Sequence, residues 1–258
     1  MSVKMSVLGS SSSGNCTFVA TNQVRILLDA GLNPIQTQKR LNAIGESLDD
    51  IDALVISHEH TDHVNGIAGI LAKRDIPVFI GEQTFAAINP RISCNRLEFM
   101  TAGQPFCLKD LKILPFSIPH DAVDPLGFTL DAEGIKIGHV TDLGYLTELV
   151  TQRLRGCDVI VLESNHDLDM LKVGPYPWPL KQRIMGREGH LSNDVAGRFF
   201  SEGFDGQASY IVLAHLSESN NHPVIARMVA VESLEPRGFN LEHLFVASKS
   251  IPSPVIEV

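Results

Sequence analysis

The sequence predicts an α/β protein, because short apolar segments rich in β-branched residues alternate along the chain with segments of helical periodicity. In addition, an acid or a histidine follows many of the apolar segments. The chain has 258 residues, 44% of them hydrophobic, which is enough for a substantial core. We expect a single domain over residues 1–258. An extended tail is expected at about residues 249–258, since Pro252 and Pro254 cannot continue a helix.

The expected elements follow one another in a regular order. Buried strands are predicted at residues 26–28, 53–56, 78–80, 135–137, 159–162 and 210–213. Helices are predicted at residues 36–44, 63–73, 147–155, 192–202 and 223–232. Asn193 and Asp194 are typical of a helix start, and Gly45 and Gly156 are typical of residues just beyond a helix end.

The charge and the cysteines limit the classes of function. Twenty-one basic and 30 acidic residues give a formal net charge of -9, which disfavours sequence-blind adsorption to DNA, RNA or anionic lipid. A nucleic-acid substrate would therefore need a locally positive surface. The four cysteines are widely spaced, which indicates reduced thiols. We expect neither a signal peptide nor a membrane span, and we expect a cytoplasmic protein, because the start of the chain leads into a Ser/Gly loop.

Acids and histidines stand at the ends of six apolar segments. In layered α/β proteins the carboxyl ends of strands form the ligand crevice, so these side chains indicate one shared site. The alternative is that polar residues simply resume where a strand ends. That explanation is reasonable for one position and poor for six. The six residues are Asp29, His58, His120, Asp142, Glu163 and His215.

The strongest chemical signal is the segment HEHTDH at residues 58–63, which holds three of the ten histidines and an aspartate. In an extended segment His58 and His60 project to the same side and can bind one ion. A turn into the helix near His63 would direct Asp62 and His63 toward a second ion. Imidazole and carboxylate ligands suit Zn or Mn, with Fe as a further option. The cluster therefore predicts a site for two divalent metal ions.

This HxHxDH pattern resembles the signature of the metallo-β-lactamase-fold hydrolases, and the resemblance extends over nearly the whole chain. It implies an αββα sandwich with two metals along one edge. It also implies that Asp29, in LDAG at residues 28–31, orients the ligands. The implied ligands of the first ion are His58, His60 and His120; those of the second are Asp62, His63 and His215; and Asp142, in TDLG at residues 141–144, bridges the two ions.

Five further segments are GSSSSGN at 9–15, ESNHD at 163–167, GPYPW at 174–178, GHLSN at 189–193 and AHLS at 214–217. They resemble the YycJ/WalJ branch of this family, which is associated with exonuclease action on DNA and is related to ribonuclease Z and to phosphodiesterases of phosphonate metabolism. The predicted function is a dinuclear metal-dependent phosphodiesterase, a DNA exonuclease. In this reaction the two bridged ions generate a hydroxide nucleophile, and Asp62 is catalytic through its place at the second ion.

Three residues beyond the ligands are predicted to act at this site. His190 begins a helical segment and resembles the histidine of ribonuclease Z-like enzymes that contacts the scissile phosphate, so it would help to protonate the leaving oxygen. The alternative is a capping or core histidine. Glu163 and Asn165 follow a buried strand and would orient ligands or substrate, respectively. For both, a structural strand cap is the alternative.

Two segments are predicted to bind substrate. The small-residue loop 11–15, with Ser12, Ser13 and Asn15, could cradle a phosphate with its backbone N–H groups, although a plain tight turn explains it as well. Lys181 and Arg183 lie in a basic and aromatic stretch at residues 172–187 that could follow a nucleic-acid strand. A solvated loop packed by Trp178 is the alternative there.

Rival functions share the same ligands. A small-molecule hydrolase acting on a cyclic phosphodiester, thioester or lactone would need a narrow pocket. A flavodiiron-type or persulfide-oxidising redox protein would use iron, and a non-catalytic module would have incomplete ligand sets. The segment between Asp142 and His215 is too short for a large cap domain, and no Gly/Pro-rich arm is evident, so DNA or a small phosphodiester is favoured over tRNA. The sequence defines no oligomeric state.

Overall fold

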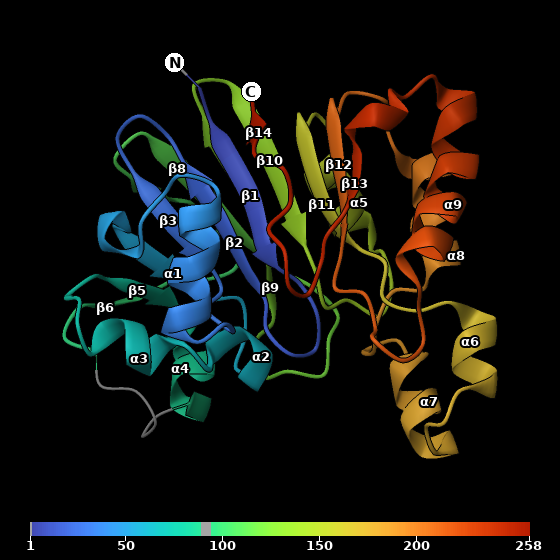
Figure 1. Cartoon of the computed structure of the whole chain (residues 1–258), viewed down its shortest axis with the longest axis horizontal. Helices are drawn as coiled ribbons and strands as arrows, with labels where there is room; N and C mark the ends of the chain where they lie inside the picture. The colour runs from blue at the N-terminus through green and yellow to red at the C-terminus, as the bar shows by residue number, and fades with distance from the viewer. Residues whose placement is uncertain (1, 89–93) are drawn as a thin grey trace.

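A computed structural model describes residues 2–88 and 94–258 and shows two sheets packed face to face, with helices on both outer sides (Figure 1). The predicted α/β class and the αββα arrangement are confirmed. The first sheet has the order β14-β1-β2-β3-β4-β5-β6. Its strands are β1 (Lys4–Gly9), β2 (Cys16–Ala20), β3 (Arg25–Leu28), β4 (Ala53–Val55), β5 (Val78–Ile80), β6 (Leu97–Phe99) and β14 (Ile256–Glu257).

The second sheet has the order β13-β12-β11-β10-β9-β8-β7. Its members are β7 (Phe106–Leu108), β8 (Leu111–Ser117), β9 (Leu126–Ala132), β10 (Ile135–Val140), β11 (Val159–Glu163), β12 (Tyr210–Ala214) and β13 (Leu244–Val246). Strands β10 to β13 run parallel to one another, as do β3 to β6. The carboxyl ends of these parallel strands therefore meet at one edge of the sandwich.

The apolar runs are continuous because both faces of each sheet are covered. Alternate residues of a strand point to opposite faces. In β12, Val212 joins the core between the two sheets, whereas Ile211 and Leu213 pack under the helices of the second sheet. In β3, Leu28 faces the inter-sheet core and Leu27 faces the helices of the first sheet. These three apolar layers account for the four-layer sandwich.

The helices cover the two outer faces (Figure 1). On the first sheet lie α1 (Pro34–Ala43), α2 (Thr61–Val64), α3 (Ile67–Leu71) and α4 (Glu82–Ile88). The second sheet carries α5 (Glu148–Leu154), α8 (Asn193–Arg198) and α9 (Pro223–Leu234). Two further helices, α6 (Leu168–Val173) and α7 (Trp178–Ile184), project beyond the sandwich at the lower right of Figure 1.

Two predicted helices differ from the observed ones. The helix expected at 63–73 is broken into α2 and α3 at Gly66, whose backbone N–H donates to the oxygen of Ala30 at 2.7 Å. A Cβ at Gly66 would lie 2.0 Å from the oxygen of Leu32, so only glycine permits this approach. The helix expected at 192–202 continues from α8 as a π-helical turn at Phe199–Gly203.

The last residues run alongside the first strand. Ile256 pairs with Met5 in an antiparallel ladder, and the hydroxyl of Ser253 accepts a hydrogen bond from the backbone N–H of Val7 at 2.9 Å. Within residues 2–88 and 94–258, no helix combines the length and the apolar character that a membrane span requires.

Candidate metal centre

Three side chains of the site stand in sharp backbone turns directly after strands. Asp29 follows β3 with φ 60°, Asp142 lies just beyond β10 with φ 60°, and His215 follows β12 with φ 55°. Left-handed backbone is costly for residues other than glycine, and such conformations concentrate at functional sites. These turns direct one carboxylate or imidazole from each strand end toward the same edge of the sandwich.

The first donor set consists of His58, His60 and His120, whose ligand atoms lie within 4.8 Å of one another. Each ring is oriented by its surroundings. The Nδ1 atom of His58 lies 2.9 Å from the hydroxyl of Ser57, and Nδ1 of His120 lies 3.1 Å from the oxygen of Gly189. His60 Nδ1 faces His120 Nε2 at 3.3 Å. His58 and His120 can therefore each bind a metal ion through Nε2, and His60 can bind the same ion through Nδ1.

The second donor set consists of Asp62, His63 and His215, again with ligand atoms within 4.8 Å. Nε2 of His63 and Nε2 of His215 each lie 3.5 Å from Oδ2 of Asp62. Both histidines are almost fully buried, whereas Asp62 is partly exposed at the start of α2. The side-chain amide of Asn15 donates to Oδ2 of Asp62 at 3.0 Å and so holds the carboxylate in place.

Asp142 lies between the two sets. One of its oxygens is 3.2 Å from Nε2 of His63, and the other is 3.8 Å from Nε2 of His120 and 3.2 Å from Nδ1 of His215. Within the described part of the chain, Nε2 of His58, Nε2 of His215 and Oδ2 of Asp142 are buried without a hydrogen-bond partner. Buried polar atoms require partners. Unpaired imidazole and carboxylate donors that converge in this way fit divalent metal ions.

Two buried carboxylates, Asp29 and Glu163, accept hydrogen bonds from the histidine nitrogens that face away from the proposed metal ions. Asp29 accepts from Nδ1 of His63 at 2.7 Å, and also from the backbone N–H of Ser57 at 2.8 Å. Glu163 accepts from Nδ1 of His215 at 2.8 Å and from Nδ1 of His190 at the same distance. A carboxylate bound to one imidazole nitrogen fixes the tautomer and directs the other nitrogen to a metal. The structure therefore places Asp29 and Glu163 where the sequence predicts them.

The electrostatics of the cluster follow from burial and from these pairs. Burial lowers the pKa of His58 and of His120. Burial would also lower the pKa of His215, but Asp142, Asp62 and Glu163 together raise it to about 10. For Glu163, burial acts to raise the pKa, yet His190 and His215 bring it down to about 2. The Glu163 carboxylate is thus held ionised, as a group that accepts hydrogen bonds from two imidazole rings must be.

His190 joins the site from the loop before α8. Its Nδ1 is bound to Glu163, its side chain is 23% exposed, and its ring lines the pocket over the donor sets. Nε2 therefore remains for a group in the pocket. Asn165 lines the same pocket, although its amide donates to the backbone oxygen of His215 at 2.7 Å. His190 and Asn165 thus both line the pocket beside the donor sets.

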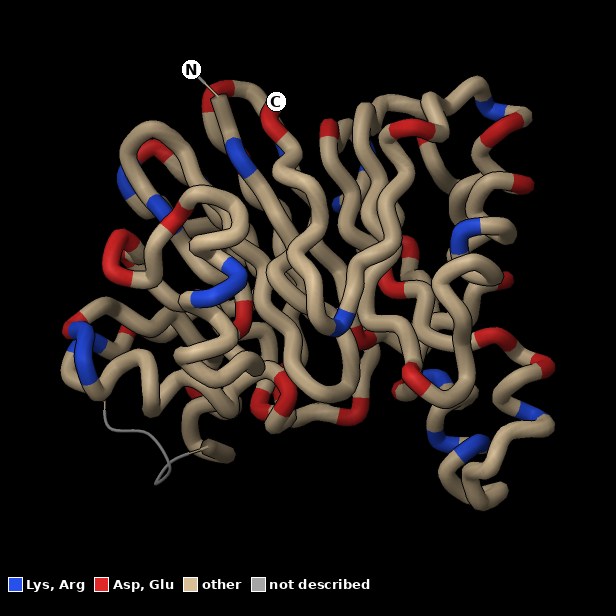
Figure 2. The backbone as a smooth tube through the Cα atoms, viewed as in Figure 1, with Lys and Arg blue, Asp and Glu red and all other residues tan. Residues whose placement is uncertain are grey.

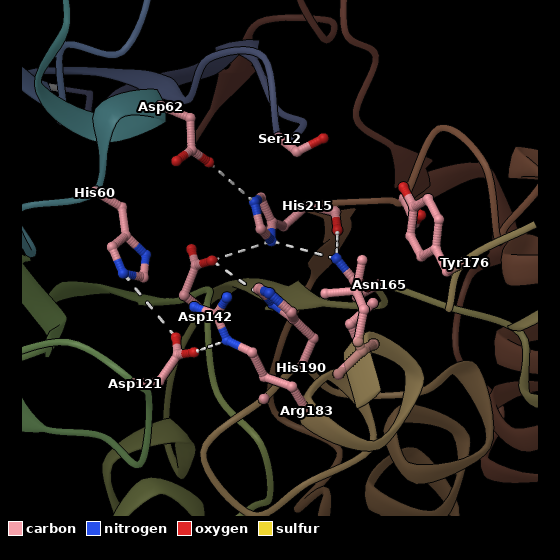
Figure 3. Close-up of a pocket in the computed structure, with 14 residues that line it drawn as sticks. Ser12, His60, Asp62, Asp121, Asp142, Asn165, Tyr176, Arg183, His190 and His215 are labelled. Atoms are coloured by element: carbon pink, nitrogen blue, oxygen red, sulfur yellow. Dashed lines mark hydrogen bonds and ion pairs between the residues drawn. The ribbon is translucent and has the colours of Figure 1, made fainter. Parts of the chain in front are cut away.

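A pocket of about 240 Å³ lies over the two donor sets. Four of the proposed ligands line it and are drawn in Figure 3: His60, Asp62, Asp142 and His215. Tyr176 and Arg183, from the projecting helical segment, line it as well. Arg183 pairs with Asp121, which in turn lies 3.4 Å from Nε2 of His120 and 4.0 Å from Nε2 of His60. The basic side chain is thus tethered beside the first donor set.

Two of the predicted substrate contacts lie elsewhere. Lys181 is 7% exposed, and its Nζ donates to the backbone oxygen of Lys172 at 2.7 Å, so it does not line the pocket. The hydroxyl of Ser13 donates to Glu218 at 2.6 Å. These two side chains have structural partners, and of the predicted basic pair Arg183 alone reaches the pocket.

The loop at residues 11–15 is a tight turn. The backbone N–H of Ser11 donates to the side chain of Asn15, and the N–H of Asn15 donates to the backbone oxygen of Asp62. The N–H groups of Ser13 and Gly14 both donate to oxygens of Ser11. A row of free N–H groups for a phosphate is therefore not available in this loop. Ser12 still lines the pocket, and Asn15 acts on Asp62.

Sequence reasoning missed two contributors to this site, Ser57 and Asp121. Ser57 links Asp29 to His58 and stands directly before the histidine cluster. Asp121 stands directly after His120, a position that could have signalled it. Tyr176, an aromatic residue of the basic and aromatic stretch at residues 172–187, lines the pocket.

An αββα sandwich with imidazole and carboxylate donors at one edge defines a metallo-hydrolase. The model of the Beta-lactamase superfamily domain matches residues 24–215. Exodeoxyribonuclease YycJ of Bacillus anthracis is 32% identical over 248 residues, which cover 95% of this chain and 94% of the relative. Exodeoxyribonuclease WalJ of Streptococcus pneumoniae is 31% identical, with 90% of this chain and 88% of the relative covered. The chain therefore belongs to the metallo-β-lactamase superfamily.

Solved structures agree with this fold. The metallo-β-lactamase fold protein YhfI from Bacillus subtilis superposes with a TM-score of 0.76 at 16% identity, over 100% of both chains. A diphosphatase from the PhnP family superposes with a TM-score of 0.66 at 17% identity, over 100% of this chain and 98% of the other. At these identities the likeness concerns the fold.

Proposed function

We propose that this protein is a dinuclear metal-dependent phosphodiesterase that degrades DNA as an exonuclease. The observation that carries the proposal is the pair of donor sets with Asp142 between them, beneath a pocket that His190 lines. The names of the two relatives, both exodeoxyribonucleases, favour DNA as the substrate. The first ion is assigned to His58, His60 and His120, and the second to Asp62, His63 and His215.

Bound divalent ions, Zn or Mn, would supply a hydroxide from water near neutral pH and stabilise charge on the attacked phosphate. Asp142 fixes the separation of the two donor sets, because its two oxygens face histidines of both. Asp29 and Glu163 hold the imidazole rings in the orientation that the ligands need. These three carboxylates therefore hold the ligand side chains in position in the absence of substrate.

His190 has a separate part in the proposed reaction. Glu163 holds its Nδ1, so the ring turns Nε2 toward the pocket, where the leaving oxygen of a phosphodiester would lie. We assign His190 to proton transfer at that oxygen. Ser12, Asn165 and Arg183 line the pocket and are assigned to the substrate, with Arg183 as the cation for a phosphate.

The test is degradation of end-labelled DNA by purified protein with Mn or Zn added. Labelled single-stranded and duplex DNA, RNA and a small chromogenic phosphodiester are incubated in parallel, with Asp62→Ala as the inactive control. We expect loss of nucleotides from a DNA end without internal fragments. Internal fragments would refute the exonuclease assignment, and activity on the chromogenic ester alone would refute DNA as the substrate.

A second candidate is a hydrolase of a small phosphodiester. The pocket of about 240 Å³ and the formal net charge of -9 favour it, because a short diester needs neither a long track nor a basic surface. Figure 2 shows acidic positions around α2 and basic ones gathered on and after α7. Of these basic residues, Arg183 lines the pocket, and together with the names of the two relatives it is the reason to prefer a nucleic acid.

A further inference from the structure

A second hollow of about 470 Å³ adjoins the pocket over the donor sets. Asp121 and Arg183 line both, so their ion pair stands at the border between the two spaces. Tyr145 and Arg187 line only the second hollow. Its volume falls in the range of about 300–1,000 Å³ that is typical of small-ligand sites. The two spaces together are suited to a ligand of more than one unit.

The hollow is built on backbone that also positions a proposed metal ligand. The N–H of Gly144 donates to the oxygen of Pro119 at 2.9 Å, and the N–H of Asp121 donates to the oxygen of Glu188 at 2.9 Å. A Cβ at Gly144 would lie 2.2 Å from the oxygen of Arg187, so glycine permits the close approach of the two loops. The walls are therefore tied to the segment that carries His120.

Tyr145 and Arg187 form a stacked pair in this hollow. The Cζ atom of Arg187 lies 4.5 Å from the centroid of the Tyr145 ring. Arg187 is exposed, and within the described residues its guanidinium takes part in none of the ion pairs found. A guanidinium held on an aromatic face keeps its N–H edge for a phosphate and loses little freedom when it binds one.

We propose that this hollow is a nucleotide subsite, in which Arg187 binds the phosphate next to the scissile phosphodiester and Tyr145 supports the guanidinium and the neighbouring sugar or base. The subsite rests on the proposed function, since it serves the same substrate strand. It explains how a small pocket over the metals can act on a polymer. In this arrangement the scissile bond lies in the pocket over the donor sets. The adjoining nucleotide lies in the second hollow, beyond the ion pair of Asp121 and Arg183.

The binding test uses the dinucleotide pdTpdT on chelator-treated protein, by calorimetry, so that no cleavage is needed. Arg187→Ala should weaken binding roughly tenfold or more, as for a charged hydrogen bond. Arg187→Lys should restore it only in part, because lysine lacks the planar fork. The matched control is Arg155→Ala, an exposed arginine beyond α5 that lines neither pocket. Binding of pdTpdT to Arg187→Ala as tight as to wild type overturns the subsite.

A second measurement separates the subsite from the metal centre. Metal-loaded Arg187→Ala and Tyr145→Ala should show a raised KM for an oligonucleotide and an unchanged rate on methyl nitrophenyl phosphate, which is too small to occupy both spaces. Equal loss on both substrates overturns the inference, because the substitutions would then act through the metal centre. Failure of wild type to cut DNA, together with Arg187-dependent binding of pdTpdT, refutes the exonuclease proposal and leaves the subsite standing.

Discussion

The two halves of the molecule contribute to the metal centre in different ways. The first sheet supplies four donors from one short segment, residues 58–63 at the start of α2. The second sheet supplies three donors singly, His120 from the loop after β8, Asp142 after β10 and His215 after β12. The compact motif at residues 58–63 therefore provides four of the seven proposed ligands. Packing of the two sheets against each other completes both donor sets.

The supporting carboxylates differ as well. Asp29, in the first half, contacts one proposed ligand directly, His63, and reaches His58 only through the hydroxyl of Ser57. Glu163, in the second half, binds both His215 and His190. The second half thus couples a proposed ligand to the proposed proton donor through one side chain. Substitutions in the two halves should therefore have separable effects.

The largest effect is expected for Asp142, the residue shared by both donor sets. Asp142→Ala should abolish measurable turnover and lower the metal content of both sites, because its oxygens face histidines of each set. Asp62→Ala should abolish turnover while leaving one ion bound, since Asp62 belongs to the second set alone. Elemental analysis beside a rate assay decides this. Near wild-type hydrolysis by Asp62→Ala would contradict the mechanism.

The next effect concerns His190. His190→Ala should retain the bound metal and lose roughly a hundred- to ten-thousand-fold in rate, as expected for a general acid or base. The reason is that its Nδ1 is bound to Glu163 and its remaining nitrogen faces the pocket. Parallel measurement of metal content and hydrolysis separates the roles. Loss of metal would make His190 a ligand, and an unchanged rate would make it structural.

A smaller and more diagnostic effect concerns the two supporting carboxylates. Asp29→Asn and Glu163→Gln should each weaken metal affinity by about ten- to a hundred-fold. At saturating metal, Asp29→Asn should recover most of its activity, whereas Glu163→Gln should remain slow because His190 also loses its partner. Rates measured over a metal titration test this contrast. Equal recovery of both variants would show that the halves are not functionally distinct.

The smallest effect concerns the two basic residues of α7. A plot of log affinity for duplex DNA against log salt concentration has a negative slope. Arg183→Ala should reduce the size of that slope by about 0.9, the value for one phosphate contact. Lys181→Ala should leave the slope unchanged and lower the stability of the segment, since its Nζ is bound to the oxygen of Lys172. Salt titrations of both variants provide the readout. A slope change in Lys181→Ala alone would reverse this assignment.

The sequence predicts the parts of this structure that depend on local pattern. The runs at β3, β4, β11 and β12 are continuous because both sheet faces are buried, so their signal is strong. The break at Gly66 depends on contact with Leu32 and Ala30, which no local pattern shows. Lys181 and Arg183 are equally basic in sequence, but only the fold buries one and brings the other to the pocket. Asp121 and Tyr145 likewise acquire their position through loops that meet in three dimensions.

The central claim is that two metal ions lie at this edge, joined by Asp142. Its most direct test is elemental analysis of gently purified protein, followed by titration with Mn or Zn to saturation. The account predicts about two ions per chain for wild type, and one for Asp62→Ala. At most one ion in wild type, with no second ion taken up on titration, would contradict it.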